Sequence, residues 1–233
     1  MRYVEKTAEP PLLSRWKKEN EETRELLVFR NLPGEAKVEI REKLLKEQGF
    51  LCAYLMKGID GWGSCHIEHI YPQARYPDRS TDYRNMVLCF PSTADGVNCD
   101  FGALHKAGAD VTPDSFVSPL NRSCETRLKF SISGEVHPRD NEDSAAKRTI
   151  DLLALNHPIL VQERIAALGG QGLGRHPYKP ISASTARRLA RTITGSDNQG
   201  RVAPFCIAIK QVSERYAKQC EDRASRLARK KGA

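Results

Sequence analysis

The residue pattern changes at Phe50, and this change constrains the fold more than any other feature of the chain. Before Phe50, the stretches "LLSRWKKENEETRELLVF" and "EAKVEIREKLLKEQ" are rich in helix formers, which predicts two helices. From Phe50 to about Ala107, "SCHIEHI" and "MVLCF" are typical of short strands, and the polar residues between them are typical of a long loop. "DFGALHKA" then predicts a helix with Asp100 as its N-cap. We therefore expect the middle of the chain to fold as two strands followed by a helix.

The rest of the sequence is mostly helical in pattern. "RLKFSISGEV" predicts a hairpin that turns at Gly134, and helices are expected over "SAAKRTIDLLALN" and "PILVQERIAAL". In the tail, apolar residues recur at helical spacing among many Lys and Arg residues, which predicts an amphipathic helix with a basic face. We expect an α+β fold with three parts: an N-terminal helical segment (1–49), a core (50–125) and a mostly helical, basic region (126–233).

The charge and the cysteine content indicate the class of protein and its partners. The 233 residues carry a net charge of +8, and such an excess favours a polyanionic partner, most often nucleic acid, although it also serves solubility. The seven cysteines are an odd number, and the first residues lack the apolar run of a signal peptide. No apolar run approaches the roughly 18 residues that a membrane span needs. We therefore expect a cytoplasmic protein with reduced thiols and no membrane partner.

A candidate site for phosphodiester hydrolysis lies in "CHIEHIYPQARYPDRSTDYRN" (65–85). Hydrolysis needs a base that takes a proton from water and a cation that neutralises negative charge on the phosphate. His69 suits the base because an unperturbed imidazole, with a pKa of about 6.5, is neutral at pH 7. Glu68 supplies a carboxylate for a cation such as Mg²⁺. Asn85 could fix the imidazole or order the loop, and His105 could be a second metal ligand.

The adjacency of Glu68 and His69 sets a geometric requirement. In a regular strand, the side chains of consecutive residues point to opposite faces. The two side chains can share a site only where the strand ends and the chain turns away. Pro72 and the polar loop around it predict such an end.

Three stretches, "HIEHIYP", "YRNMVLC" and "CDFGALHK", resemble the motif of HNH endonucleases. The chain is most similar to the PtuB HNH proteins of Septu anti-phage systems and of some retrons. Further matching pieces are "MRYVEKTAEP", "GFLCAY", "CETRLKFSISGEV" and "AAKRTIDLLALNHPIL", so the resemblance covers most of residues 1 to 168. It implies a ββα-metal core embedded in a mostly helical protein. It also implies an anti-phage endonuclease that cuts DNA or RNA beside a PtuA-like ATPase.

The resemblance assigns a role to each residue of the candidate site. His69 matches the general base, Glu68 matches the ligand of a Mg²⁺ or Mn²⁺ ion, and Asn85 matches the middle Asn, which orients the base. His105 is preferred at the last motif position because an imidazole on the helix is the commonest form. That position is open to three residues, namely His105, Asp100 and Asn98.

The cysteines depart from the family pattern. Members of the family often carry two CxxC pairs that hold a structural zinc ion, but Leu55 stands where the second cysteine of the first pair belongs. A tetrahedral zinc site requires four thiolate or imidazole ligands. The thiols that could still form one are those of Cys52, Cys65, Cys89 and Cys99. The alternative is that these cysteines are small, buried, apolar residues.

The basic residues of the C-terminal region leave two functions open. Arg187, Arg188 and Arg191 could contact phosphates together with the basic tail, and a solvated charged face explains them about as well.

The sequence predicts a metal-dependent HNH endonuclease. The competing interpretation is a nucleic-acid-binding or assembly module whose ββα core is stabilised by zinc and catalyses nothing.

Overall fold

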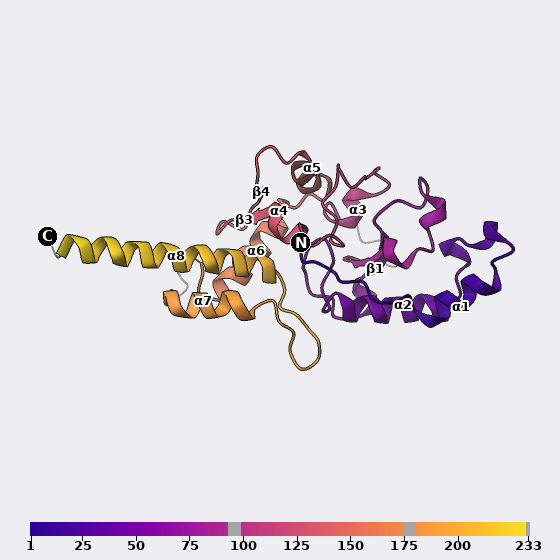
Figure 1. The fold of residues 1–233 in the computed structure, drawn as a ribbon, viewed down its shortest axis with the longest axis horizontal. Helices are drawn as coiled ribbons and strands as arrows, with labels where there is room; N and C mark the ends of the chain where they lie inside the picture. The colour runs from indigo at the N-terminus through magenta and orange to yellow at the C-terminus, as the bar shows by residue number, and fades with distance from the viewer. Residues whose placement is uncertain (93–98, 175–179, 232–233) are drawn as a thin grey trace.

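The chain folds into a body of short elements from which one long helix projects (Figure 1). A computed structural model describes residues 1–92, 99–174 and 180–231. In this described part the α-helices are α1 (Pro11–Glu19), α2 (Gly34–Glu47), α3 (Ala103–Lys106), α4 (Cys124–Arg127), α5 (Ser144–Leu152), α6 (Pro158–Gly170), α7 (Ala183–Thr192) and α8 (Cys206–Lys231). Short 3₁₀ turns lie at Arg24–Leu26, Phe29–Asn31, Trp62–Ser64, Pro77–Arg79 and Tyr83–Asn85. The fold is therefore mixed α+β and rich in helix, as expected.

Two antiparallel pairs of strands form the sheets of the described residues, beside two isolated β-bridges. The first pair joins β1 (His66–His69) to β2 (Met86–Cys89), with His69 opposite Met86 in the register. The second joins β3 (Leu128–Phe130) to β4 (Val136–Pro138), and its turn contains Gly134 at φ 77°. Both predicted strands of the middle region and the predicted hairpin are thus confirmed.

The N-terminal helices agree only in part with the expectation. The second predicted helix is confirmed as α2, which Gly49 follows with a φ of 60°. The first predicted helix is wrong in length, because α1 ends at Glu19 and irregular turns follow it. Residues 20–25 contain no apolar side chain, and Leu26 is 45% exposed. A helix without an apolar face gains too little from packing to continue.

The start of α3 also differs from the expectation. Gly102, not Asp100, is the N-cap residue, and no side chain caps this helix. Gly102 has a φ of 74°, and a Cβ atom there would lie 3.1 Å from a methyl carbon of Leu55. Its backbone N–H donates to the carbonyl of Leu153 at 2.8 Å. The chain therefore turns at Gly102 in a conformation that favours glycine, and Asp100 lies exposed outside the helix.

Buried side-chain amides satisfy the edges of both small sheets. A two-stranded sheet has open edges, and buried backbone groups there need partners. Gln48, which follows α2, accepts a hydrogen bond from the N–H of Leu88 and donates to the carbonyls of Leu88 and Leu51. Gln211 of α8 does the same for β3, since it accepts from the N–H of Phe130 and donates to the carbonyl of Leu128. Each amide therefore pairs with backbone groups at the edge of its sheet, as a third strand would.

We expect replacement of Gln48 by leucine to destabilise the protein by about 2 to 4 kcal/mol, because the buried N–H of Leu88 and carbonyl of Leu51 would lose their partner. The carbonyl of Leu88 would keep the N–H of Ala53. Urea unfolding followed by circular dichroism would measure the loss. The matched control is Gln219→Leu on the exposed face of α8. Equal midpoints for Gln48→Leu and the control would show that Gln48 does not support β2.

An ion pair joins α4 to the start of α5. The Arg127 guanidinium donates to both carboxylate oxygens of Asp143, at 2.7 and 2.6 Å. Asp143 is also the N-cap residue of α5, and it accepts from the N–H of Ala146. The hydrogen bond from Arg127 lowers the pKa of Asp143 below its usual value of 3.8. The carboxylate is therefore the form that stabilises the fold.

Replacing Asp143 by alanine is expected to cost about 1 to 2 kcal/mol of stability at pH 7. Because the pKa of Asp143 is lowered in the folded state, this contribution is present above about pH 4 and is lost as the pH falls through the folded-state value. Denaturant unfolding of wild type and Asp143→Ala at pH 7 and at pH 3 would test this. A difference that stays constant between the two pH values would refute the assignment.

One apolar core draws residues from all three predicted parts of the chain, for example Leu13, Leu88 and Leu160. A smaller cluster, which includes Leu168, Ile209 and Val212, packs α6 and α7 onto the first half of α8. The second half of α8 extends beyond α7, away from the rest of the chain (Figure 1). The predicted amphipathic basic helix is thus confirmed.

None of the helices in the described part of the chain is long and apolar enough to cross a bilayer.

Candidate functional site

The candidate site lies where β1 ends. His69 is the last residue of this strand, and Pro72 follows three residues later. The requirement that Glu68 and His69 sit at a strand end is therefore met. Residues 70–85 form the loop that leads back to β2, and Gln73 and Ser80 of this loop contact the imidazole of His69.

The Asn85 amide holds this loop in shape. Asn85 is 1% exposed. Its Oδ1 accepts from the N–H of Tyr71 at 2.8 Å, and its Nδ2 donates to the carbonyls of Tyr71 and Arg79 at 3.0 and 3.1 Å. All three partners are backbone groups of the loop. Of the two roles expected for Asn85, the structure supports ordering of the loop, and the amide acts on His69 only through that loop.

The loop in turn orients the His69 ring. The carbonyl of Ser80 lies 2.8 Å from Nε2 of His69. A carbonyl only accepts, so Nε2 carries the proton and Nδ1 keeps its lone pair. The side-chain amide of Gln73 lies 3.2 Å from Nδ1, and Phe29 packs edge-on against the ring at 5.0 Å. His69 therefore presents a proton-accepting nitrogen whose neighbour, Gln73, is an exposed side chain.

The charge state of His69 suits a base. His69 is 5% exposed. Burial lowers its pKa from 6.5, the nearby charge of Lys106 lowers it further, and the hydrogen bond to Ser80 opposes both. The imidazole is thus neutral at pH 7, as a general base must be.

Glu68 pairs with a lysine on the other side of the site. The Lys106 ammonium lies 2.8 Å from Oε1 of Glu68 and 3.3 Å from the backbone oxygen of His69. Lys106 is 1% exposed, and the Glu68 side chain is 15% exposed. Burial raises the pKa of Glu68, and Lys106 opposes this rise. Burial raises the pKa of the Tyr54 hydroxyl well above its usual value, and the nearby Glu68 carboxylate raises it further.

His105, the residue preferred for the third motif position, does not lie beside Glu68 and Lys106. It is exposed, and its Nδ1 lies 3.0 Å from the carbonyl of Leu152. Consecutive residues of a helix do not face the same neighbour. Since Lys106 faces Glu68, the adjacent His105 faces elsewhere. Of the two alternatives, Asp100 is exposed and Asn98 lies outside the described residues.

His66 lies two residues before Glu68 and on the same side of β1. Its Nε2 is 3.9 Å from Oε2 of Glu68. Its Nδ1 lies within hydrogen-bonding distance of the carbonyl of Pro91. His66 is buried at 9% exposure, so it borders the Glu68–Lys106 pair rather than the solvent.

A divalent cation does not fit the arrangement of the described residues. Glu68 offers a single carboxylate, and the buried ammonium of Lys106 already binds it. Within residues 1–92, 99–174 and 180–231, no three His, Cys, Asp or Glu side chains are grouped so that they could hold one metal ion. The pairing of Glu68 with His105 as ligands of Mg²⁺ or Mn²⁺ therefore finds no support in the geometry.

The four cysteines do not fit a zinc site either. Cys52 and Cys89 lie together in the core, where Sγ of Cys52 accepts from the N–H of Phe90 at 3.3 Å. Burial raises the pKa of Cys52, but hydrogen bonds from Cys89 and from backbone N–H groups outweigh burial and lower it to about 7. Sγ of Cys65 lies 3.8 Å from the carbonyl of Gly61, and Sγ of Cys99 lies 3.4 Å from that of Phe101. Among the described residues these thiols are therefore not grouped as a tetrahedral ligand set.

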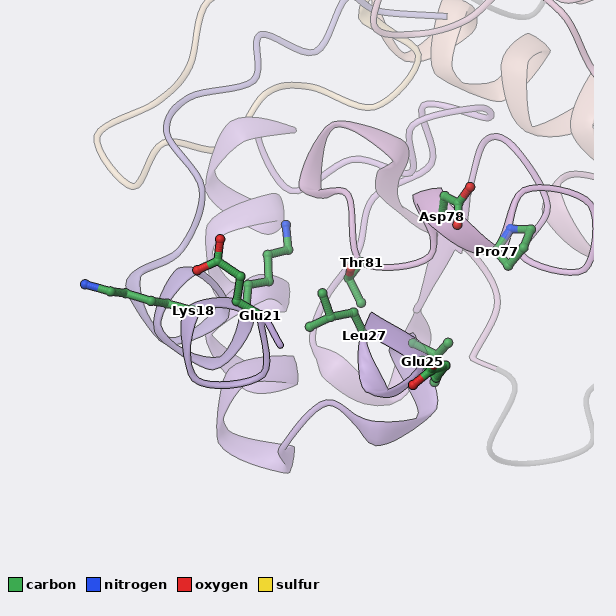
Figure 2. A pocket seen from close by; sticks show the side chains of 9 residues that line it. Lys18, Glu21, Glu25, Leu27, Pro77, Asp78 and Thr81 are labelled. Atoms are coloured by element: carbon green, nitrogen blue, oxygen red, sulfur yellow. The ribbon is translucent and has the colours of Figure 1, made fainter. Parts of the chain in front are cut away.

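A cavity of about 770 Å³ lies next to the loop that holds His69. Its lining comes from the N-terminal segment and from the loop, and includes Lys18, Glu21, Glu25, Asp78 and Thr81 (Figure 2). Thr81 directly follows Ser80, whose carbonyl binds His69. The cavity contains neither Glu68 nor His69, and acidic side chains line it alongside basic ones. It is therefore a neighbour of the candidate site and not the site itself.

The predicted phosphate-binding arginines lie on α7 and differ in surroundings. Arg187 donates two hydrogen bonds to Glu221 of α8, so its charge is already paired. Arg188 and Arg191 are exposed. Further exposed cations follow the free half of α8, namely Arg223, Arg226 and Arg229. The basic surface of this region therefore centres on residues other than Arg187.

Comparison with known proteins adds no family to this description, because no family model matches the sequence and no curated protein matches it.

Proposed function

We propose that this chain hydrolyses phosphodiester bonds of nucleic acid, with His69 as the general base and β1, β2 and α3 as the ββα core of an HNH endonuclease. The observation that carries the proposal is the fixed orientation of His69. Its Nε2–H donates to the carbonyl of Ser80, so Nδ1, which the Gln73 amide contacts, is the nitrogen that can take a proton. The Lys106 ammonium, which is paired with Glu68, lies 3.3 Å from the backbone oxygen of His69.

The proposed reaction uses few groups. A water molecule that replaces the Gln73 amide at Nδ1 gives its proton to His69, and its oxygen forms the new bond to phosphorus. The bond from phosphorus to the leaving oxygen breaks, and that oxygen keeps the electron pair and takes a proton from solvent. Asn85 keeps the loop, and therefore the Ser80 carbonyl, in place during this step.

The charge of the chain supports nucleic acid as the substrate. The net charge is +8, and exposed arginines follow the free half of α8. Cations arranged along a projecting helix suit contact with a phosphate backbone. We further propose that the chain acts in the cytoplasm as the nuclease of an anti-phage system beside a PtuA-like ATPase. This partner rests on the sequence resemblance.

The test is a cleavage assay on labelled single-stranded DNA, double-stranded DNA and RNA. The purified chain is assayed alone and with the candidate ATPase, in chelator and with Mg²⁺ or Mn²⁺, while binding is measured in parallel by fluorescence anisotropy. We expect cleavage of at least one substrate. Binding without cleavage under all these conditions would replace the proposal with the non-catalytic module.

A further inference from the structure

Lys106 occupies the place beside Glu68 where the sequence led us to expect a metal ion. Its ammonium lies 2.8 Å from Oε1 of Glu68. The contact is built into the fold, because α3 starts at the turn that Gly102 makes and Gly102 is tied to Leu153. Lys106 is buried at 1% exposure, so its contact with Glu68 is not a chance contact of a flexible surface side chain.

The ammonium and a divalent ion would compete for this carboxylate. Two positive charges a few ångströms apart repel strongly where water is scarce. An ion bound by Glu68 would therefore have to displace Lys106, whose charge would then be buried without its partner. The backbone oxygen of His69 holds the ammonium from a second side at 3.3 Å.

Lys106 also has a donor to offer a substrate. An ammonium carries three N–H groups. In the described part of the chain, Glu68 and the His69 carbonyl use two of them, which leaves one for a phosphate oxygen. The Glu68 side chain is 15% exposed, so the pair lies just beneath the surface.

We propose that the Lys106 ammonium takes the place of the divalent cation in this site. It stabilises negative charge on the phosphate of the substrate by hydrogen bonding, in the way that lysine clamps act in phosphoryl transfer. Glu68 is then a positioning residue that holds the ammonium, and no divalent ion enters the step. This inference rests on the proposed function for its catalytic part, whereas the exclusion of a metal ion can be tested without activity.

The first experiment measures Mn²⁺ binding by electron paramagnetic resonance on chelator-stripped protein. We expect wild type and Glu68→Gln to bind Mn²⁺ equally weakly, and Lys106→Met to bind it about ten-fold or more tightly than wild type. Wild-type binding that is about ten-fold tighter than that of Glu68→Gln would overturn the inference. If the thermal melt shows that Lys106→Met does not fold, the comparison of wild type with Glu68→Gln still shows whether Glu68 binds Mn²⁺.

The second experiment measures cleavage in excess chelator. We expect wild type to retain its rate there, Lys106→Ala to lose about 10²-fold or more, and Lys106→Arg to recover part of that loss. Lys147→Ala, which removes an exposed lysine, is the matched control. Cleavage that requires a divalent ion and survives in Lys106→Ala would overturn the inference and leave the proposed function standing. If nothing cleaves in any condition, the proposed function fails, and Mn²⁺ binding alone decides whether Lys106 excludes the metal ion.

Discussion

Replacing His69 by alanine is expected to slow cleavage of nucleic acid by about 10²- to 10⁴-fold, because a positioned general base contributes that much to a hydrolysis. This expectation rests on the protonation state of His69. The Ser80 carbonyl holds the proton on Nε2, and burial keeps the ring neutral at pH 7. Single-turnover cleavage of a labelled oligonucleotide would measure the rate, and anisotropy would show that substrate binding is retained.

His105 supplies the matched control for this experiment. It is also a histidine of the motif region, but it is exposed and bound to the carbonyl of Leu152. We expect His105→Ala to cleave within a few-fold of the wild-type rate. A large loss in His105→Ala together with a small loss in His69→Ala would reverse the two assignments.

Replacing Asn85 by alanine is expected to lower the free energy of unfolding by about 3 kcal/mol or more. The amide makes three hydrogen bonds to the backbone of the loop: it accepts from the N–H of Tyr71 and donates to the carbonyls of Tyr71 and Arg79. Alanine would leave the N–H and the carbonyl of Tyr71 without this partner at a position that is 1% exposed, whereas the carbonyl of Arg79 would keep the N–H of Asp82. The loop would then no longer hold the Ser80 carbonyl against His69, so cleavage should fall as well.

Urea unfolding of Asn85→Ala would measure the stability change. Asn31→Ala is the control, because Asn31 is exposed and its amide makes one hydrogen bond, to the carbonyl of Leu26. Asn85→Asp gives a second comparison, since it keeps the acceptor for Tyr71 but turns a carboxylate oxygen toward two carbonyls. Asn85→Ala with the stability of wild type would show that the loop is held by other contacts.

The order of elements around the site was predictable because it depends on local patterns. Alternating and β-branched residues predicted β1 and β2, and the polar, proline-containing stretch between them predicted the loop. The end of a strand at His69 followed from the need to bring neighbouring side chains to one site. These features rest on residues close together in the sequence, so no tertiary contact had to be known.

The partner of Glu68 could not be predicted in the same way. His105 and Lys106 are adjacent on a short helix, and which of them faces β1 depends on how Gly102 sets the start of that helix. The sequence signal was present as a glycine two residues after Asp100, but its φ of 74° becomes visible only in the structure. A buried lysine beside a glutamate carries no local pattern at all.

The buried amides illustrate a similar limit. Gln48 directly follows α2 and Gln211 lies in α8, and the local sequence does not distinguish them from exposed polar residues. Their role depends on strand edges that lie 40 residues or more away, such as Leu88 for Gln48. Only the packing of α2 and α8 against the small sheets shows which polar side chains are buried.

The most direct test of the proposed site is the pH dependence of single-turnover cleavage for wild type and for His69→Ala. Because burial lowers the pKa of His69 from 6.5, we expect the wild-type rate to be level with respect to this group above pH 6.5 and to fall as the pH drops through the lowered pKa. The slower reaction of His69→Ala should lack this decline. Profiles of the same shape for both proteins, or cleavage at equal rates, would contradict the assignment of His69 as the general base.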